Sequence, residues 1–190
     1  KNEAFKTAGQ VQYVAACGNF RKAGHDYNGS LRILKTILNY DYLWMNLRVK
    51  GGAYGCMCGF KRTGDAYLVS YRDPNLAKTL QTYEGCAEYL KNFTCSDRDM
   101  TKYIIGTISE LDTPLNPSAK GNLSLNCYFS GMTESDFQKE RDEILDAACK
   151  DIQALAPLVE AVVAQHNICV IGSAAGIEKD KDLFKEVKEF

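Results

Sequence analysis

The stretch that most constrains the fold runs from Trp44 to Pro74, WMNLRVKGGAYGCMCGFKRTGDAYLVSYRDP. A helix with a basic last turn is predicted to end at Gly51 and Gly52, because glycine adopts positive φ without a Cβ penalty. Two apolar-rich segments follow, at 54–61 and 66–71, with a short turn between them. This pattern predicts an antiparallel hairpin directly after a helix end.

The glycine pair has a geometric consequence for two polar side chains. Arg48 lies at the helix end and Tyr54 at the start of the first strand, on opposite sides of one tight turn. Both side chains can therefore project toward a single ligand. Spacing alone favours a structural role, in which Arg48 interacts with the helix C-terminus and Tyr54 packs on the sheet. We expect Tyr13 and Trp44 to be core residues.

Further elements follow from periodicity before and after this stretch. Residues 11–17 are predicted to form a strand, and a helix capped by Asn28 or Ser30 is predicted to continue to Arg48. Asp73 and Pro74 are expected to begin the next helix, with Asp73 as its N-cap. Helical stripes are predicted up to Phe93 and again over residues 96–111, and Pro114–Gly131 is predicted to be a functional loop or a partly helical crossover.

The last third of the chain alternates helix and strand signals. Thr133 and Asp136 resemble a capping box at the start of a long helix that Pro157 must break or kink. Residues 168–171 are predicted to be a buried strand, and residues 179–190 a charged amphipathic helix.

Together these elements predict an α+β fold. A hairpin and two flanking strands would form a single layer of mixed, mainly antiparallel sheet, with helices packed mainly on one face. With 190 residues, 45% of them hydrophobic, the chain is long enough for one buried core, and we expect residues 1–190 to form a single domain.

Composition argues against several classes of partner. The formal net charge of -1 and the absence of a wide basic block argue against nucleic acid and anionic membrane surfaces. The sequence has no apolar run of the roughly 20 residues that a membrane helix needs, and its first residues have no signal-peptide core. The eight cysteines are scattered, and we expect them to be reduced.

The sequence shows no self-sufficient catalytic centre. Its two histidines, His25 and His166, lack the H-x-x-E-H or H-E-x-x-H spacing that places zinc ligands on one helix face. Cys56 and Cys58 share a strand face, but no second Cys or His pair supports a zinc site. The segment GGAYG has neither a phosphate-loop nor a dinucleotide-binding pattern. We therefore predict no metal ligands and no cofactor site in this chain.

Several separated motifs nevertheless point to one family. The segments RVKGGAYG, SYRDPN, IIGTISELDTP and KGNLSLNCYFSGMTESDFQKERDEIL occur in this order. They closely resemble the C-terminal half of the presequence-protease branch of the pitrilysin/insulinase zinc metallopeptidases. The resemblance covers nearly the whole chain. It implies four related α+β domains, paired into two halves around a peptide chamber, of which this chain would be the last domain.

The resemblance also implies roles for two residues. Arg48 and Tyr54 match the arginine and tyrosine that the C-terminal half of such enzymes contributes to a zinc site held by the N-terminal half. The implied partners are that N-terminal half and unfolded peptides, and the implied cofactor is zinc with ligands outside this chain. We expect an intracellular location, in the cytoplasm or an organelle matrix.

Other residues receive structural interpretations, and other functions stay open. Arg72 is expected to pair with Asp73, and the charged run 139–143 to be a solvated helix face. The alternative functions are a noncatalytic structural or interaction domain of the same architecture, and a small-molecule binding module built on the glycine turn.

Overall fold

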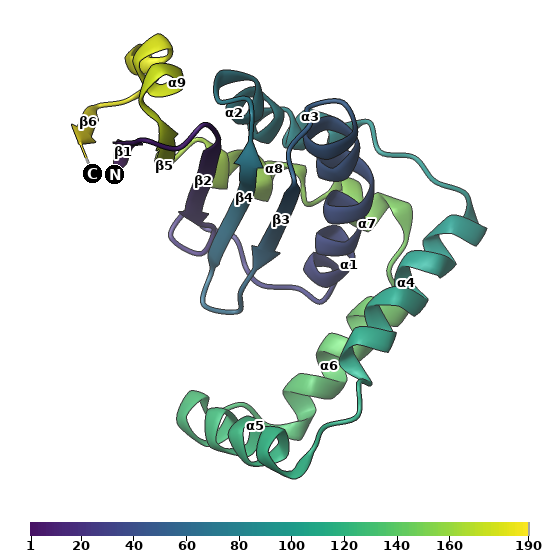
Figure 1. The fold of residues 1–190 in the computed structure, drawn as a ribbon. Helices are drawn as coiled ribbons and strands as arrows, with labels where there is room; N and C mark the ends of the chain where they lie inside the picture. Colours follow the sequence, from purple (N-terminus) through teal and green to yellow (C-terminus); the bar gives the residue numbers. More distant parts are fainter. Residues whose placement is uncertain (190) are drawn as a thin grey trace.

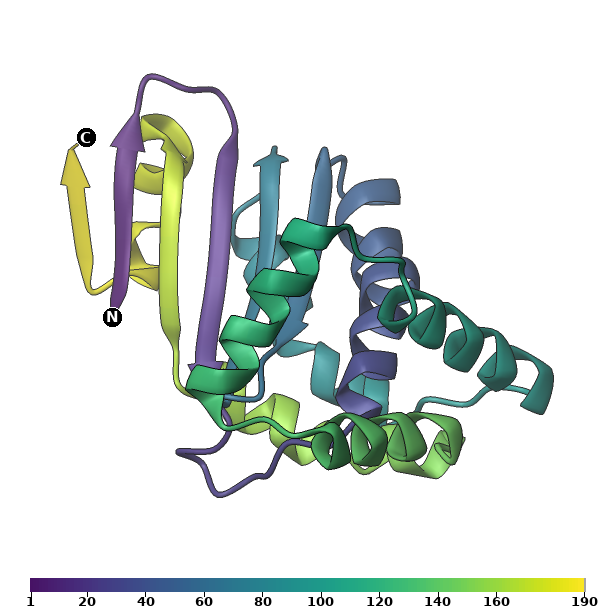
Figure 2. The same ribbon diagram turned by 90° about the horizontal axis from the view of Figure 1, so that it is seen from below.

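A computed structural model describes residues 1–189 as a six-stranded sheet covered by helices (Figures 1 and 2). The strands run in the order β3-β4-β2-β5-β1-β6. Their bounds are β1 Asn2–Thr7, β2 Gln12–Asn19, β3 Gly55–Phe60, β4 Asp65–Asp73, β5 Asn167–Ser173 and β6 Glu186–Glu189. β1 pairs in parallel with β5 and β6, and the other three pairings are antiparallel. The expected mixed, mainly antiparallel sheet is confirmed.

Helical segments fill most of the remaining chain. They are α1 Ser30–Ile37, the π-helical segments η1 Leu38–Tyr42 and η2 Trp44–Val49, α2 Ala77–Glu84, α3 Cys86–Lys91, α4 Asp97–Leu111, α5 Pro117–Ser130, α6 Glu134–Leu145, α7 Cys149–Gln153, α8 Ala156–Val163, α9 Ala174–Lys179 and the 3₁₀ turn η3 Lys181–Leu183. The helix predicted to continue to Arg48 is confirmed, although its second half winds with π-type turns. The N-terminus and β6, the last described strand, lie at the edge of the sheet opposite β3 (Figure 2).

The helices bury mainly one face of the sheet, as predicted. Along β2, Val14 and Ala16 are buried while Tyr13 and Cys17 are exposed, because successive side chains of a strand point to opposite faces. The same alternation along β4 buries Ala66 and Leu68. Tyr13 therefore lies on the open face, and its expected place in the core is wrong.

Two strands that the sequence did not predict extend the sheet at its far edge. β1 adds a parallel neighbour to β5, and β6 pairs with β1 over residues predicted to be a terminal helix. The side chains of β6 are all exposed, so its position depends on backbone pairing rather than on burial. Charged residues are typical of such edge strands, and their pattern in this segment was interpreted as that of an amphipathic helix. Phe190, the last residue of the predicted helix, lies outside the described residues.

Pro114–Gly131 is mostly helix rather than loop. The side chain of Asn116 caps α5 by accepting a hydrogen bond of 2.9 Å from the Ala119 N–H, and Pro117 occupies the first turn. Gly131 ends the helix in the left-handed region, with φ of 69°. These start and stop signals were present in the sequence, but the helix buries none of its residues and so lacks the apolar periodicity that usually reveals one.

The long helix predicted from Thr133 is divided in three. The capping box of Thr133 and Asp136 is confirmed at the start of α6. α6 ends at Leu145, and α7 and α8 follow after short breaks. Pro157 lies in the first turn of α8, where its missing N–H has no helical partner to lose.

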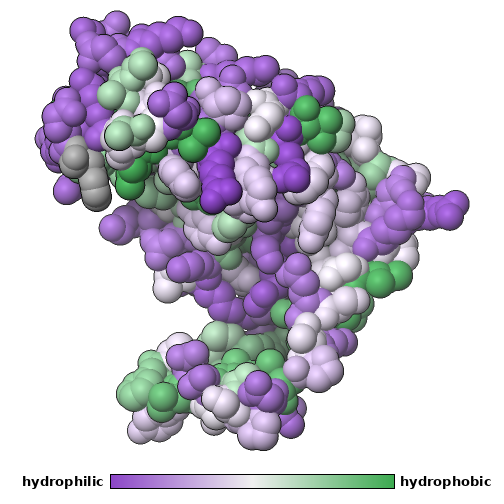
Figure 3. All heavy atoms as spheres, viewed as in Figure 1, coloured by the Kyte–Doolittle hydropathy of each residue, from purple (hydrophilic) through white to green (hydrophobic). Residues whose placement is uncertain are grey.

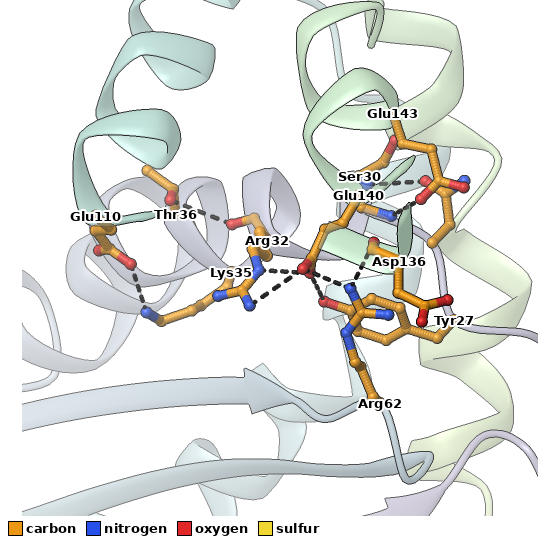
Figure 4. A network of polar contacts seen from close by, with 12 residues as sticks. Tyr27, Ser30, Arg32, Lys35, Thr36, Arg62, Glu110, Asp136, Glu140 and Glu143 are labelled. Carbon is orange, nitrogen blue, oxygen red and sulfur yellow. Dashed lines mark hydrogen bonds and ion pairs between the residues drawn. The ribbon is translucent and has the colours of Figure 1, made fainter. Parts of the chain in front are cut away.

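A buried carboxylate fastens α6 to the body of the domain (Figure 4). Glu140 is 2% exposed and accepts hydrogen bonds from Arg32 Nε and Arg62 Nη2, each at 2.6 Å, and from the Tyr27 hydroxyl. These partners come from α1, from the turn between β3 and β4, and from the loop before α1. Residue 140 was predicted to lie on a solvated helix face, and this is wrong for Glu140 because two guanidinium groups compensate its burial.

The same contacts set the acid stability expected of the domain. Burial raises the pKa of Glu140, but the hydrogen bonds from Arg32, Tyr27 and Arg62 outweigh burial and leave this pKa below its ordinary value. A carboxylate with a lowered pKa in the folded state stabilises the fold above its unfolded pKa of about 4.3. That contribution is lost as the pH falls through the lower, folded value.

We predict that Glu140→Gln lowers the free energy of unfolding at pH 7 by about 2 kcal/mol or more, because it leaves two arginines without their carboxylate. The variant should also lose less stability than wild type between pH 5 and pH 3. Urea unfolding across this pH range measures both effects. Asp112→Asn is the matched control: it breaks the exposed Arg141–Asp112 ion pair of 2.6 Å and should leave the free energy of unfolding nearly unchanged, because water screens this pair. Equal losses in the two variants would contradict the role of Glu140.

Candidate functional site

The fold brings Arg48 and Tyr54 together at the β3 edge of the sheet. The guanidinium carbon of Arg48 lies 5.5 Å from the centre of the Tyr54 ring and 4.6 Å from the ring centre of Trp44. Tyr54 is 57% exposed. Trp44 is exposed as well, so its predicted place in the core is wrong. The site is therefore an open aromatic and cationic surface on η2 and the start of β3.

Hydrogen bonds through the glycine turn position these two side chains. The N–H of Gly52 donates to the Arg48 carbonyl at 3.0 Å, and the N–H of Ala53 donates to the Leu47 carbonyl at 2.9 Å. Gly52 has φ of 80°, a conformation that glycine adopts without strain. The side chain of Asn75 donates to the Gly51 carbonyl at 2.6 Å and so ties the turn to the segment after β4.

A second glycine allows an aromatic ring to cover the strand. A Cβ atom on Gly55 would lie 2.3 Å from the Tyr71 ring, so only glycine allows Tyr71 to lie across β3 at this point. The Tyr71 and Tyr54 ring centres are 5.7 Å apart. Tyr71 therefore supports one side of Tyr54.

Asp73 does not have the role predicted for it. α2 begins at Ala77, and the fully buried Asp73 carboxylate accepts hydrogen bonds from the Asn75 N–H at 2.9 Å and the Thr79 hydroxyl at 2.7 Å. These contacts organise the turn between β4 and α2. Within residues 1–189 no ion pair joins Asp73 to Arg72, so the predicted pairing is wrong.

Arg72 instead joins the site, which sequence reasoning missed. Its guanidinium carbon lies 5.4 Å from the centre of the Tyr54 ring, within the range of a cation–π contact. Its carbonyl accepts a hydrogen bond of 3.2 Å from the Tyr54 N–H. The motif SYRDPN marked this position, but sequence adjacency favoured Asp73 as the partner.

The donor groups of the chain do not fit a zinc site. Over residues 1–189, no three His, Cys, Asp or Glu side chains come together in a way that could hold a metal ion. Burial raises the pKa of Cys56 to about 11 and that of Cys58 to about 12, which keeps both as thiols rather than metal-binding thiolates near neutral pH. All eight cysteines are free.

In the described part of the chain, no helix is both long enough and apolar enough to cross a membrane.

Comparison with known proteins defines the class of protein. The family model described as the PreP C-terminal domain matches residues 2–174. This chain therefore belongs to the PreP C-terminal domain family, which confirms the resemblance seen in the motifs.

Two curated relatives and one solved structure show where the chain fits in longer proteins. It is 46% identical to "Protein HypA" of Clostridium perfringens over 99% of this chain and 19% of that protein. It is 36% identical to "Presequence protease 1, chloroplastic/mitochondrial" of Arabidopsis thaliana over 100% of this chain and 18% of that protein. The fold matches a crystal structure of pitrilysin with a TM-score of 0.60 and 13% identity, over 100% of this chain and 22% of that chain. The chain thus spans about a fifth of the length of the curated relatives it matches.

We predict that Gly52→Ala lowers the free energy of unfolding by about 1 to 2 kcal/mol, because alanine is strained at positive φ. Gly121→Ala is the matched control. Gly121 lies inside α5 with no atom within 4 Å of an added Cβ, so alanine there should stabilise the helix slightly. Thermal unfolding of both variants measures the difference. Equal melting temperatures for the two would contradict the requirement for glycine at the turn.

Proposed function

We propose that this chain is the C-terminal domain of a zinc metalloendopeptidase that degrades unfolded peptides in a closed chamber. In this proposal residues 1–190 form the last of four related domains, and the N-terminal half of the same protein provides the zinc ligands. Membership of the family and the absence of a metal-binding group from residues 1–189 support this division of labour.

One observation carries the proposal: the half-buried Arg48 and the exposed Tyr54 lie side by side, with no hydrogen bond or ion pair to their side chains among the contacts of residues 1–189. A structural role would give the guanidinium a carboxylate or a helix-end carbonyl, and would bury the phenol. Neither side chain contributes to the hydrogen bonding of the fold, so both are available to bind a ligand.

The chemistry of the pair suits peptide hydrolysis at a centre supplied from outside this chain. Negative charge develops on the carbonyl oxygen when water attacks a peptide bond, and the Tyr54 hydroxyl can donate a hydrogen bond to that oxygen. The planar fork of Arg48 suits a backbone carbonyl or a carboxylate of the same peptide. Stacking on Trp44 restricts the Arg48 side chain and lowers the entropy lost on binding.

The exposed side of α5 supports the N-terminal half as partner. Tyr128 is 81% exposed and Phe129 76% exposed, and no residue of α5 is buried. α5 extends from the body of the domain, and apolar side chains gather on the lobe that it forms (Figures 1 and 3). A lone helix of 14 residues is marginal in water, so we propose that this face packs on the remaining four-fifths of the full-length protein.

The proposed location is intracellular, in the cytoplasm or an organelle matrix. The name of the Arabidopsis relative, which places that protein in chloroplasts and mitochondria, supports this.

We predict that Tyr54→Phe in the full-length protein lowers kcat on an unfolded peptide by about 100-fold, the usual effect of losing one donor to the developing oxyanion. The melting temperature should change little, because no hydrogen bond within residues 1–189 involves the Tyr54 hydroxyl. Tyr40→Phe, on an exposed tyrosine of η1, is the matched control and should leave turnover unchanged. Unchanged turnover of Tyr54→Phe would favour a noncatalytic interaction domain.

Hydrogen exchange tests the proposed packing of α5. In the full-length protein we expect the α5 amides to be protected about as well as those of α4, which packs on α1 and α6. Exchange of α5 at the rate of an unstructured peptide would contradict the proposal. Protection that rises with protein concentration would identify a second copy, rather than the N-terminal half, as the partner.

A further inference from the structure

Arg72 has a backbone conformation that its residue type disfavours. Its φ is 48°, in the left-handed region, and the only other non-glycine residue of the described chain with positive φ is His166. The register between β2 and β4 shifts here, since Gln12 pairs with Asp73 and Val14 with Ser70. β4 therefore has one extra residue opposite Tyr13, which is a β-bulge, and bulges commonly redirect a side chain next to a functional site. Glycine would satisfy the same backbone without strain.

The redirected side chain of Arg72 lies beside the ring of Tyr54, which the guanidinium group of Arg48 also contacts. The guanidinium carbons of Arg72 and Arg48 lie 5.4 Å and 5.5 Å from the centre of the same Tyr54 ring. The nearest acidic residue in sequence, Asp73, is fully buried, and Asn75 and Thr79 satisfy its carboxylate. Among the ion pairs within residues 1–189, none involves Arg48 or Arg72.

This arrangement brings two positive charges to one site, and no ion pair within residues 1–189 neutralises either of them. Arg32 and Arg62, by contrast, share the carboxylate of Glu140. Within residues 1–189 the side chains of Arg48 and Arg72 have aromatic partners, which hold a guanidinium in place and leave its N–H donors available. Two guanidinium groups beside the Tyr54 ring suit an anion with two oxygens, such as a carboxylate.

We propose that Arg72 and Arg48 together bind a carboxylate group of the peptide, with the Tyr54 ring as their shared aromatic support. The proposal rests on the proposed function and adds to it: the site selects peptides with a carboxylate near the bond to be cleaved. The carboxylate is either the C-terminus of the peptide or an acidic side chain.

Four forms of one fluorescent peptide test the proposal with the full-length protein. The parent has a free C-terminus and one internal glutamate; the others have an amidated C-terminus, glutamine in place of the glutamate, or both changes. The dissociation constant is measured by anisotropy with EDTA present to prevent cleavage. We expect the wild-type protein to bind the doubly neutral form at least about tenfold more weakly than the parent, as loss of one charged hydrogen-bonded contact predicts. The singly changed form that reproduces this loss identifies the carboxylate.

The variant Arg72→Gly should bind the parent and the doubly neutral peptide equally. His166→Gly is the matched control: it also relieves a positive φ, but at the turn before β5, and should retain the wild-type preference. If Arg72→Gly does not fold, Arg72→Asn replaces it, because asparagine tolerates the left-handed region and carries no charge.

Two results would overturn the inference. One is an Arg72→Gly variant that keeps the wild-type preference for the parent over the doubly neutral peptide. The other is an Arg72→Gly variant whose affinity falls by the same factor for all four peptides. Turnover of Tyr54→Phe decides the proposed function separately. Loss of that turnover together with an unchanged preference in Arg72→Gly would leave the peptidase role in place and remove Arg72 from it.

Discussion

The burial of one face of the sheet is the constraint on which the other features depend. Side chains such as Val14, Ala16 and Leu68 lose their contact with water against the helical layer, and this apolar burial is the main stabilising term of such a fold. Because strand side chains alternate, the same pairing sends Tyr13 and Cys17 to the open face. The helix that supplies much of the layer, from Ser30 to Val49, ends at the β3 edge, and this places Arg48 beside that edge.

Two sets of charged groups in this domain contrast with each other. Glu140 is buried, and its burial is compensated by Arg32, Arg62 and Tyr27, so that α6 is held to α1 and to the β3–β4 turn (Figure 4). Among the contacts of residues 1–189, the side chains of Arg48 and Arg72 have aromatic partners and no ion pair. This contrast with Glu140 supports our proposal that the two arginines bind an anionic group of a ligand.

The open edge is consistent with our proposal that this chain forms one part of a larger active site. Nothing in residues 1–189 encloses Tyr54, whereas hydrolysis of a peptide bond benefits from a site that excludes water. A second half of the protein that closes over this edge would supply both the enclosure and the metal. The exposed aromatic side chains of α5 provide an apolar area on which such a half can pack.

The sequence by itself determined the elements whose signals are local. The glycine pair, the hairpin and the capping box of Thr133 and Asp136 each depend on backbone preferences of a few residues, and each is present where it was predicted. The motif RVKGGAYG likewise identified Arg48 and Tyr54 as candidate site residues. The order of the predicted elements indicated the α+β class.

Only the tertiary structure decided the pairings between distant segments. The residues of strand β6 were predicted to be helical because their charged pattern is compatible with a helix or a strand. Backbone hydrogen bonds to the otherwise unpaired edge of β1 make this segment a strand. From the sequence Glu140 was expected to be solvated, but Arg32 and Arg62 from other elements donate hydrogen bonds to it. Arg72 was expected to pair with Asp73, but the Thr79 hydroxyl donates to that carboxylate instead. In each case the partner lies in another element or across a turn, and residue spacing along the chain does not encode which polar groups meet when the core closes.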